Sequence, residues 1–356
     1  MPPSNVTIAY DPLEHMSHTN ASEIHIYKLK QTGVNVIIAI NSIARGPAIG
    51  GCRYVEYNST ADAIADAINL SYAMSLKAAF HNLPHGGAKA VIIKSNPNID
   101  RQALFNDFAN LLNDLNGKYI TSLDSGTSAA DMDYIFEKTE YVLGHNHSNI
   151  KVISDPSYYT AKGVKKALEA AAFNKFGNAS LKNRSIAIMG SGNVGEYLLQ
   201  FLTSESANIT ITDIDTQKAQ QLANKYNCSY KSPTDFIFQS CDILIPCALG
   251  KVFTEENIAK LQTKIICGAS NNQLSHESLA LKLQQQGILY IPDYVANGGG
   301  LIFAAAKYSG YISNVEADIQ NIKAATSKLL ALAASQNTPP LDLANNIALN
   351  KINHEQ

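Results

Sequence analysis

Tryptophan is absent from this chain of 356 residues, and cysteine is scarce. The five cysteines include no CxxC pair, which argues against a disulfide framework or a zinc site and favours a reduced compartment. No apolar run reaches the roughly 18 residues of a membrane-spanning helix. The N-terminal segment lacks the basic residues and the apolar core of a signal peptide, so we expect a cytoplasmic protein.

An excess of charge of one sign is also missing. The formal net charge of −2 gives no electrostatic basis for binding nucleic acid or an anionic membrane surface. What the chain does have is a hydrophobic share of 46%, which predicts a globular protein. Its length is enough for two substantial cores.

Strand-like and helix-like segments alternate along the chain, which predicts an α/β protein of two domains. The first domain is expected at residues 1–140, and a hinge near 140–155 leads to a second at 150–314. Closing helices within 315–356 are available to pack back on the first domain. The first domain has strand patterns at 24–41, 87–94 and 118–123 and helix patterns at 60–80, with Thr60 as the expected N-cap, 101–116 and 127–138.

The second domain reads as a doubly wound parallel sheet. Strands are predicted at 185–190, 208–213, 241–246, 264–269 and 287–292, and helices at 160–176, 193–204 and 216–226. Two further helices, at 315–336 and 341–352, close the chain.

A glycine pattern, Gly190-x-Gly192-x-x-Gly195, follows the strand-like SIAIM and precedes a helix. In this context the glycines allow a tight turn, a close approach of backbone to a pyrophosphate, and close helix–strand packing. Asp213 lies 23 residues after Gly190, where a carboxylate hydrogen-bonds a ribose 2′-OH and repels a 2′-phosphate. The pattern predicts binding of NAD in preference to NADP. The alternative is a glycine-rich turn in a non-binding domain.

Two lysines twelve residues apart, Lys77 and Lys89, carry the chemical signal of the first domain. Lys77 shares one helical face with Leu70 and Met74, which puts an ammonium on an otherwise apolar stripe. Lys89 follows Gly86-Gly87-Ala88 and opens a run of strand-forming residues. A lysine in such surroundings tends toward a lowered pKa, which suits a general base. The alternatives are a lysine whose stem alone is buried for Lys77, and a solvent-facing strand end for Lys89.

Asp124 lies just past a short apolar strand and before a helix, where an aspartate also commonly forms the turn alone. Asp131 and Asp133 in that helix are expected to be surface charges. The histidine pairs His81/His85 and His145/His147 lack the spacing of a metal motif, so we interpret them as loop residues and propose no metal. Cys52 has no partner histidine in the sequence and is not proposed as a nucleophile.

Taken together, these segments make the chain resemble the glutamate/leucine/phenylalanine/valine dehydrogenases, and the leucine dehydrogenase branch in particular. The likeness extends from about Ala44 to about Lys351, with order and spacing in agreement. The segments that carry it are GPAIGGCRY, MSLKAAFHNLPHGGAKAVII, TSLDSGTSAADMDYI, TAKGVKKALEAAA, MGSGNVG, CDILIPCALG, GASNNQL and PDYVANGGGLI.

The resemblance assigns roles to individual residues. Lys77 corresponds to the lysine that binds the substrate carboxylate, with Gly50 and Gly51 lining that site. Lys89 corresponds to the lysine that activates water or holds the carbonyl oxygen, and Asp124 to the acid that moves a proton to and from the substrate nitrogen. Other residues expected to shape the substrate site are Ile49, Met74, Asn297, Leu301 and Ala304. Residues expected to contact the cofactor are Thr160, Gly190, Gly192, Asn193, Val194, Gly195, Asp213, Ala248 and Asn272.

The reaction implied by this likeness is the reversible, NAD-dependent oxidative deamination of an apolar L-amino acid, such as leucine, valine or isoleucine, to its 2-oxo acid and ammonia. The substrate is expected between the two domains, so that closure excludes water. A homo-oligomer, a dimer or an octamer, is implied as well. Two alternatives stay open: a family member acting on phenylalanine or tryptophan, favoured by the small Ala304, and a catalytically silent NAD-binding sensor or scaffold.

The chain also departs from the family pattern at several places. Ala88 stands where a third glycine is usual, and Ser154 to Tyr158 replace the usual Gly-Asn-Pro-Ser-Pro. The segment AAAKYSGY at 304–311 lacks the usual acidic pair. The tail after Lys351 is shorter than is typical of leucine enzymes.

Overall fold

The computed structural model of the protein describes residues 10–95, 98–146, 155–234, 236–248 and 250–353. The chain forms two compact units, Met1–Lys151 together with Lys351–Gln356, and Val152–Asn350. The hinge predicted near 140–155 lies partly outside the described residues, and His147 and Ser154 lie wholly outside them.

The first unit is built on a mixed sheet with strand order β1-β2-β4-β3-β5. Its strands are β1 (Glu23–Lys28), β2 (Asn35–Ser42), β3 (Ala48–Val55), β4 (Gly86–Ile93) and β5 (Tyr119–Leu123). β1 and β2 form an antiparallel hairpin and β2 is antiparallel to β4, whereas β3 is parallel to both β4 and β5. The carboxyl ends of three parallel strands therefore lie at one edge of the sheet, where α/β proteins gather functional side chains.

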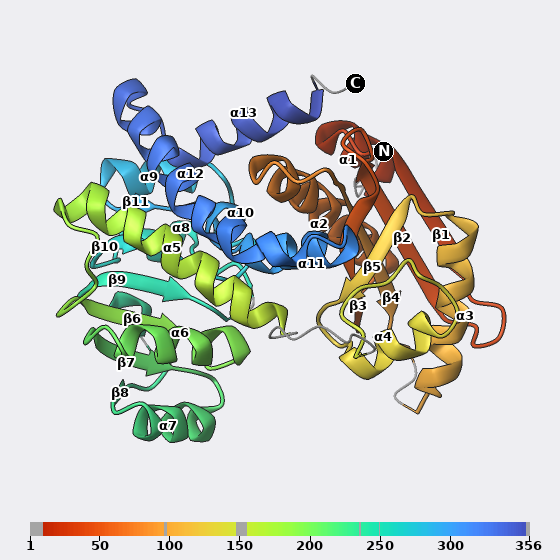
Figure 1. Ribbon diagram of the computed structural model, residues 1–356, viewed down its shortest axis with the longest axis horizontal. Helices are drawn as coiled ribbons and strands as arrows, with labels where there is room; N and C mark the ends of the chain where they lie inside the picture. Colours follow the sequence, from red (N-terminus) through yellow and green to blue (C-terminus); the bar gives the residue numbers. More distant parts are fainter. Residues whose placement is uncertain (1–9, 96–97, 147–154, 235, 249, 354–356) are drawn as a thin grey trace, which may run out of the picture. The chain divides into compact units, whose positions relative to one another are not determined.

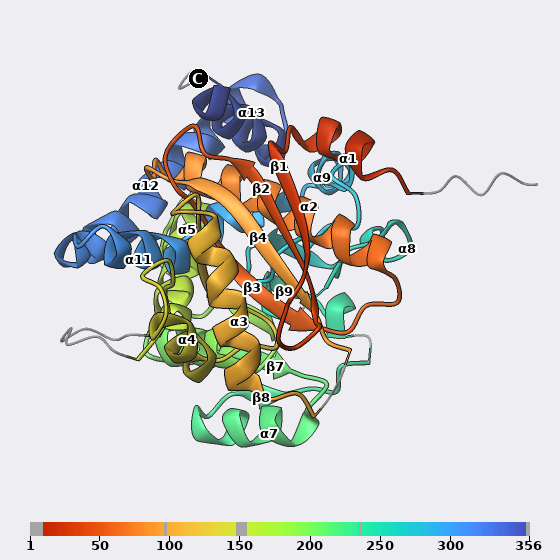
Figure 2. The same ribbon diagram turned by 90° about the vertical axis from the view of Figure 1, so that its right-hand side faces the viewer.

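Different helices cover the two faces of this sheet (Figure 1). The helices are α1 (Pro12–Thr19), α2 (Thr60–Phe80), α3 (Arg101–Asp114) and α4 (Ala129–Phe136). On one face, Ala63 of α2 packs in a small core with Ile37 and Val91 of the sheet. On the other face, Phe108 of α3 and Met132 of α4 belong to a larger core (Figure 2). The side-chain alternation of β3, β4 and β5 thus decides which residues face α2 and which face α3 and α4.

Helix α2 begins one residue away from the predicted cap. The prediction that Thr60 is the N-cap is wrong, because Ser59 has the extended backbone of a cap and its hydroxyl accepts a hydrogen bond from the Asp62 N–H. Thr60 is the first helical residue.

Strand β3 is an element that the sequence pattern does not indicate. Pro47 precedes it and two glycines occupy its centre, which hides the alternation of a strand. It nevertheless pairs with β4 on one side and β5 on the other. A Cβ at Gly50 would lie 1.7 Å from the carbonyl oxygen of Ala88, so the close approach of these two strands requires glycine there.

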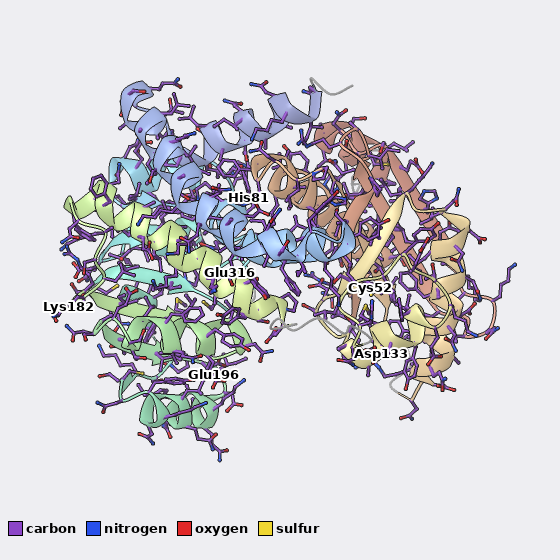
Figure 3. The ribbon with its side chains drawn as sticks, in the orientation of Figure 1. Cys52, His81, Asp133, Lys182, Glu196 and Glu316 are labelled. Carbon is purple, nitrogen blue, oxygen red and sulfur yellow. The ribbon has the colours of Figure 1, made fainter. Side chains whose placement is uncertain are left out.

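The prediction that Asp131 is a surface charge is wrong. Asp131 is buried, its carboxylate accepts hydrogen bonds from Ser128 in a capping box, and it contacts Arg101 in an ion pair of 2.5 Å. Asp133, on the same helix (Figure 3), accepts hydrogen bonds from the backbone and side chain of Asn146. Both carboxylates therefore fix the local structure of α4 and the loop that follows it.

The second unit contains a wholly parallel sheet with strand order β11-β10-β9-β6-β7-β8. Its strands are β6 (Ser185–Met189), β7 (Asn208–Thr212), β8 (Ser229–Tyr230), β9 (Cys241–Pro246), β10 (Thr263–Ile266) and β11 (Leu289–Tyr290). The chain runs outward from β6 to β8, returns to β9 beside β6, and then runs outward to β11. This is the predicted doubly wound sheet, and its direction reverses between β6 and β9, the place where such sheets bind ligands.

Helices of the second unit pack on this sheet and on one another. They are α5 (Pro156–Phe176), α6 (Asn193–Thr203), α7 (Thr216–Lys225), α8 (Glu255–Ile258), α9 (Leu279–Gln285), α10 (Asp293–Ala296), α11 (Gly299–Tyr308), α12 (Val315–Gln336) and α13 (Pro340–Asn353), with 3₁₀ turns at Phe236–Phe238 and Ile312–Asn314. The last turn of α13, from Lys351, belongs to the first unit. α5 lies beside α6, and α12 runs along α5 (Figure 1). α5 begins at Pro156, before the predicted residue 160, because Asp155 caps it by accepting a hydrogen bond from the Ser157 N–H. Among the described residues, no helix is long and apolar enough to cross a membrane.

Candidate active site

The candidate catalytic residues of the first unit are built on β4, which presents Lys89 toward α2. Ala88 and Ala90 belong to the core on the α3 side, so Lys89 between them faces the other way. Lys89 is only 6% exposed. The methyl of Ala88 therefore packs in the opposite core, away from the face that carries Lys89.

Helix α2 brings Lys77 to the same face of the sheet. A Cβ at Gly87 would lie 2.1 Å from the Ser75 backbone nitrogen, so the glycine allows α2 to lie directly on β4 two residues before Lys89. Lys77 follows two residues after Ser75 and is buried. Leu70 and Met74, which share its helical stripe, are buried and half-buried. Both sequence-predicted lysines are thus buried groups on adjoining elements.

Asp124 directly follows β5 and forms an ion pair with Lys89, whose Nζ lies 2.6 Å from Asp124 Oδ2. Strand β3 runs between β4 and β5, and the pairing of Cys52 with Ala90 puts Gly51 beside Lys89. Because Gly51 has no side chain, the lysine can extend across β3 to the aspartate. A Cβ at Gly51 would lie 2.8 Å from the Asp124 Cβ.

Arg53, which the sequence reasoning missed, is a second cation on Asp124. It lies two residues after Gly51 on β3, and its Nε donates to Asp124 Oδ2 at 3.1 Å. Its Nη1 donates to Asp66 Oδ2 on α2 at 2.7 Å, and the Tyr57 hydroxyl donates to the same oxygen at 2.5 Å. The sequence held one signal for Arg53, namely an arginine two positions after a Gly-Gly pair in a buried strand. That signal was missed because β3 was not recognised as a strand.

The charges around Asp124 decide its ionisation. Burial alone would raise the pKa of this carboxyl group, but the charges of Lys89 and Arg53 hold the pKa well below its ordinary value. Asp124 is therefore a carboxylate at neutral pH. Cys52, on the same strand as Arg53 (Figure 3), faces the opposite core, and burial raises the pKa of its thiol to about 12. A thiol in that state is a core residue and no nucleophile.

The second unit carries the predicted cofactor motif, the glycine turn between β6 and α6. Gly190 has φ +115°, a conformation that residues with a side chain rarely adopt. A Cβ at Gly195 would lie 2.1 Å from the Gly190 carbonyl oxygen, so close helix–strand packing requires glycine there. At Gly192, the N-cap of α6, no atom of the described residues outside the adjoining chain lies within 4 Å of the place of a Cβ. The helix N-terminus with Asn193 and Val194 is therefore open to an anionic group.

Asp213, at the end of β7, is held against this turn. Its Oδ2 accepts hydrogen bonds from the Ser191 N–H at 2.5 Å and the Ser191 hydroxyl at 2.8 Å, and its Oδ1 accepts one from the Asp215 N–H at 2.9 Å. Burial alone would raise the pKa of Asp213, but these donors hold it below its ordinary value. Ile214 follows immediately and is 92% exposed. An isoleucine so exposed beside a cofactor motif was missed in the sequence, where it reads as part of an ordinary strand end.

A third group of predicted residues lies where α5 meets α10 and α11. A Cβ at Gly299 would lie 1.9 Å from the Tyr159 carbonyl oxygen, and one at Gly300 would lie 2.5 Å from the Thr160 hydroxyl. The glycines of the NGGG segment thus let α5 approach closely and bring Thr160 near the start of α11. Leu301 and Ala304 lie on α11 and are buried and half-buried.

Asn297 has a buried side chain, and one of its polar atoms has no hydrogen-bond partner among the described residues. Its Nδ2 donates to the Ala269 carbonyl oxygen at 3.0 Å and to Asn271 Oδ1 at 2.8 Å. Its Oδ1 is buried and accepts no hydrogen bond from the described residues. The predicted Asn272 is exposed, and its N–H donates to Asp293. Ala248, exposed just past β9, completes the predicted cofactor residues.

The predicted residues therefore fall into two sets. Those in the first unit are Ile49, Gly50, Gly51, Met74, Lys77, Lys89 and Asp124. Those in the second are Thr160, Gly190, Gly192, Asn193, Val194, Gly195, Asp213, Ala248, Asn272, Asn297, Leu301 and Ala304. Acid–base groups lie in the first set, and the dinucleotide motif lies in the second.

Known proteins provide the decisive comparison. The dimerisation domain of the Glu/Leu/Phe/Val dehydrogenases matches residues 18–141, and the Glutamate/Leucine/Phenylalanine/Valine dehydrogenase domain matches residues 210–356. The leucine dehydrogenase of Geobacillus stearothermophilus is 36% identical over 91% of this chain and 88% of its own length. The valine dehydrogenase of Streptomyces albus is 34% identical over 94% and 93%. The chain belongs to the Glu/Leu/Phe/Val dehydrogenase family.

Solved structures agree with this assignment. The crystal structure of L-tryptophan dehydrogenase from Nostoc punctiforme matches with a TM-score of 0.81 and 32% identity, over 96% of this chain and 99% of that one. The hetero-hexameric glutamate dehydrogenase of Thermus thermophilus, at 18% identity and a TM-score of 0.78, covers 100% and 97% and shows the shared fold. The family resemblance drawn from the sequence is confirmed, and the protein is an amino-acid dehydrogenase that uses a nicotinamide cofactor.

The residues of this dehydrogenase fit such a cofactor. The open N-terminus of α6 at Gly192 has room for a pyrophosphate, and the Asp213 carboxylate lies against the same turn. Asn297 Oδ1 is a buried acceptor without a donor among the described residues, the kind of atom that a carboxamide or hydroxyl group would satisfy.

Proposed function

We propose that this dehydrogenase catalyses the reversible, NAD-dependent oxidative deamination of an apolar L-amino acid, such as leucine, valine or isoleucine, to its 2-oxo acid and ammonia. The observation that carries the proposal is the contact of 2.6 Å between the buried Lys89 and Asp124, in a unit whose helix α2 carries a second buried lysine, Lys77. Two cations and a carboxylate on one side of the sheet meet the two needs of the reaction. A cation can bind the substrate carboxylate, and the remaining pair can transfer protons.

Substrate binding falls to Lys77 in this mechanism. Its ammonium pairs with the α-carboxylate, in a site that the backbone of Gly50 and Gly51 is proposed to line. A fixed cation holds the reacting carbon in one orientation, which lowers the entropic part of the barrier.

Proton transfer falls to Asp124 and Lys89. The Asp124 carboxylate takes a proton from the substrate ammonium, and loss of hydride from Cα then gives an iminium ion. A bound nicotinamide would supply the hydride acceptor. Water adds to the iminium carbon while Lys89, in its neutral form, takes one water proton, which gives a carbinolamine. Asp124 returns its proton to the nitrogen, the C–N bond electrons leave with ammonia, and the hydroxyl proton passes to the departing ammonia, so ammonium and the 2-oxo acid are released. Lys89 then loses its proton to solvent.

The apolar substrate class rests on the residues assigned to the side-chain pocket. Ile49, Met74, Leu301 and Ala304 carry no charge. Burying the second carboxylate of a glutamate among such residues, without a partner, would cost several kcal/mol. We therefore propose that L-glutamate is a poor substrate.

The choice of NAD rests on Asp213. Its carboxylate is ionised and held by Ser191, so it can accept a hydrogen bond from a ribose 2′-OH and repel a 2′-phosphate. The exposed Ile214 next to it is proposed to cover one face of the adenine ring. The first unit, which matches the family's dimerisation domain, is proposed to join copies of the chain into a homo-oligomer.

One assay tests these proposals together. NADH formation is followed by absorbance at alkaline pH with a panel of L-amino acids, and each is repeated with NADP⁺. Highest kcat/KM for leucine, valine or isoleucine with NAD⁺ supports the proposal. Efficient turnover of L-glutamate contradicts the substrate class, and NADP⁺ equal to or better than NAD⁺ contradicts the cofactor choice. Binding of NADH without turnover of any amino acid would instead identify a silent NAD-binding protein.

A second candidate is an aromatic amino acid. Ala304 is half-buried and small, and a branched residue in its place would leave less room for a ring. The likeness to the tryptophan dehydrogenase of Nostoc punctiforme is also of the same order as the likeness to leucine enzymes. Phenylalanine or tryptophan as the best substrate in the same panel would decide for this candidate.

A further inference from the structure

We infer that Arg53 is a positioning residue for Asp124, the cation that stays on this carboxylate when Lys89 turns to the substrate. The inference rests on the proposed function for its kinetic consequences, whereas the contact itself can be tested in the protein without ligands.

The starting observation is that two cations share one oxygen of Asp124. Lys89 Nζ lies 2.6 Å and Arg53 Nε 3.1 Å from Oδ2. In the proposed reaction Lys89 has to reach the water or oxygen at the substrate carbon, and it then leaves Asp124. A largely buried carboxylate without a counter-ion would be costly and would lose its orientation. Arg53 prevents this because its contact does not depend on Lys89.

Arg53 is suited to that task by the way it is held. Its Nε donates to Asp124 and its Nη1 to Asp66, so one rigid guanidinium spans two carboxylates, one after β5 and one on α2. The Tyr57 hydroxyl donates to the same Asp66 oxygen and fixes the far end. The Arg53 side chain is 20% exposed and cannot rotate without breaking both contacts. Lys89, by contrast, is held by a single terminal atom on a flexible stem.

The contacts given for both cations converge on Asp124 Oδ2. The Ser125 backbone N–H donates a further hydrogen bond to this carboxylate. The cations and the loop backbone together hold the carboxylate in one orientation. Arg53 therefore acts on the reaction only through Asp124.

The kinetic test compares Arg53→Gln, Arg53→Lys and a matched control, Arg101→Gln. Arg101 also pairs with a buried aspartate, Asp131, in the same unit. It donates to the Gly126 carbonyl oxygen at 3.0 Å, so it holds the loop after Asp124 through the backbone and controls for loosening of that loop. Arg53→Gln should lower kcat by about 10- to 100-fold and change KM for the amino acid by less than about threefold, since Lys77 is intact. Arg53→Lys keeps the charge but not the two-carboxylate span, so it should recover part of the lost kcat. Arg101→Gln should keep kcat within about twofold.

A graded series extends this test along the chain of contacts. The loss of kcat should decrease from Arg53→Gln to Asp66→Asn to Tyr57→Phe, since each group is one contact further from Asp124. A solvent isotope effect on kcat larger than in the unchanged enzyme is expected for Arg53→Gln, because proton transfer then limits the rate. Wild-type kcat in Arg53→Gln would overturn the inference, as would equal losses of kcat in Arg53→Lys and Arg53→Gln accompanied by equal losses of stability.

The second test uses the unliganded protein and does not depend on the reaction. Melting temperatures are measured for Arg53→Gln, Asp124→Asn and the double variant. The double variant should lose less than the sum of the two single losses, because the two residues interact. Additive losses would refute the contact. If Arg53→Gln does not fold, Arg53→Lys serves in the same cycle. Failure of every amino acid as a substrate would reject the proposed function while this cycle still decides whether Arg53 holds Asp124.

Discussion

At the level of single residues, Lys77 and Lys89 are both buried but are proposed to act differently. Lys89 contacts the Asp124 carboxylate and is proposed to act in the chemical step, whereas Lys77 is proposed to hold the substrate in ground and transition states alike. Lys89→Ala should therefore lower kcat by roughly 10²–10⁴-fold. Lys77→Ala should mainly raise KM, with a smaller loss of kcat from misorientation. Initial rates over a range of amino-acid concentrations separate the two effects. A folded Lys89→Ala variant with near-normal kcat would mean that Lys89 is only structural.

A second prediction for a single residue concerns Asp213 and the choice of cofactor. Its carboxylate is the charge beside the glycine turn that would face a 2′-phosphate. Asp213→Ala should lower kcat/KM for NAD⁺ and raise it for NADP⁺, which narrows the difference between them. Because Asp213 also holds Ser191, Asp213→Asn is the matched variant: it keeps a hydrogen-bonding side chain and removes the charge. An unchanged ratio of the two cofactors in both variants would contradict the role of the charge.

Among the secondary-structure elements, β3 contributes to the candidate site because two of its residues have no side chain. Lys89 crosses this strand at Gly51, and a Cβ there would lie 2.8 Å from the Asp124 Cβ and 2.9 Å from the Leu123 carbonyl oxygen. Gly51→Ala should therefore lower kcat by separating the ion pair and should lower the melting temperature modestly. Gly50→Ala, with its Cβ 1.7 Å from a backbone oxygen, should destabilise the protein far more. Thermal unfolding and kcat of the two variants are the measurement. A Gly51→Ala enzyme with full activity would show that Lys89 can still reach Asp124 when a methyl group is present at residue 51.

Helices α5 and α12 provide a prediction on stability and pH. Burial alone would raise the pKa of Glu169 on α5, but Lys323 of α12, with Lys165 and Lys166, lowers this pKa to about 2. Since the folded pKa lies below that of the unfolded chain, the stabilisation is complete above the unfolded value of about 4.3 and is lost as the pH falls toward 2. Glu169→Gln should cost on the order of 2 kcal/mol at pH 7 and progressively less in acid.

The matched control for Glu169 is Glu316→Gln. Glu316 also bridges these two helices, through Lys162 at 2.7 Å, but its side chain is 55% exposed. Its loss should cost no more than about 0.5 kcal/mol. Urea unfolding at several pH values measures both variants, and a pH-independent cost of Glu169→Gln would contradict the electrostatic explanation.

For the whole molecule, the two units divide the chemistry. The dinucleotide turn and Asp213 lie in the second unit and the lysines in the first. NADH binding, followed by fluorescence, should therefore stay within about twofold of the unchanged enzyme in both Lys77→Ala and Lys89→Ala. A large loss of NADH affinity in either variant would mean that the lysine shapes the cofactor site as well.

Much of this architecture could be predicted from the sequence, and the failures have physical causes. The parallel sheet and the glycine turn follow from local patterns, because strand alternation, helix caps and φ requirements act over a few residues. β3 was missed since its glycines serve the packing of neighbouring strands. Arg53 was missed because its partner Asp124 is 71 residues away and only the sheet brings the two together. Asp131 was misjudged because its burial depends on Arg101, which lies on another helix.

Close backbone contact in the first unit has a consequence for how this enzyme can be altered. At Gly50, Gly86 and Gly126 a carbonyl oxygen of a neighbouring segment occupies the space where a side chain would start, at 1.7, 1.7 and 1.9 Å from the position of a Cβ. These positions accept no other amino acid, whether in natural drift or in a mutant library. Variation in substrate range has to come from positions that already carry side chains, such as Met74 and Ala304. A directed-evolution library should therefore keep the glycines fixed and randomise the side-chain positions, and nearly all of its members should then retain the geometry on which turnover depends.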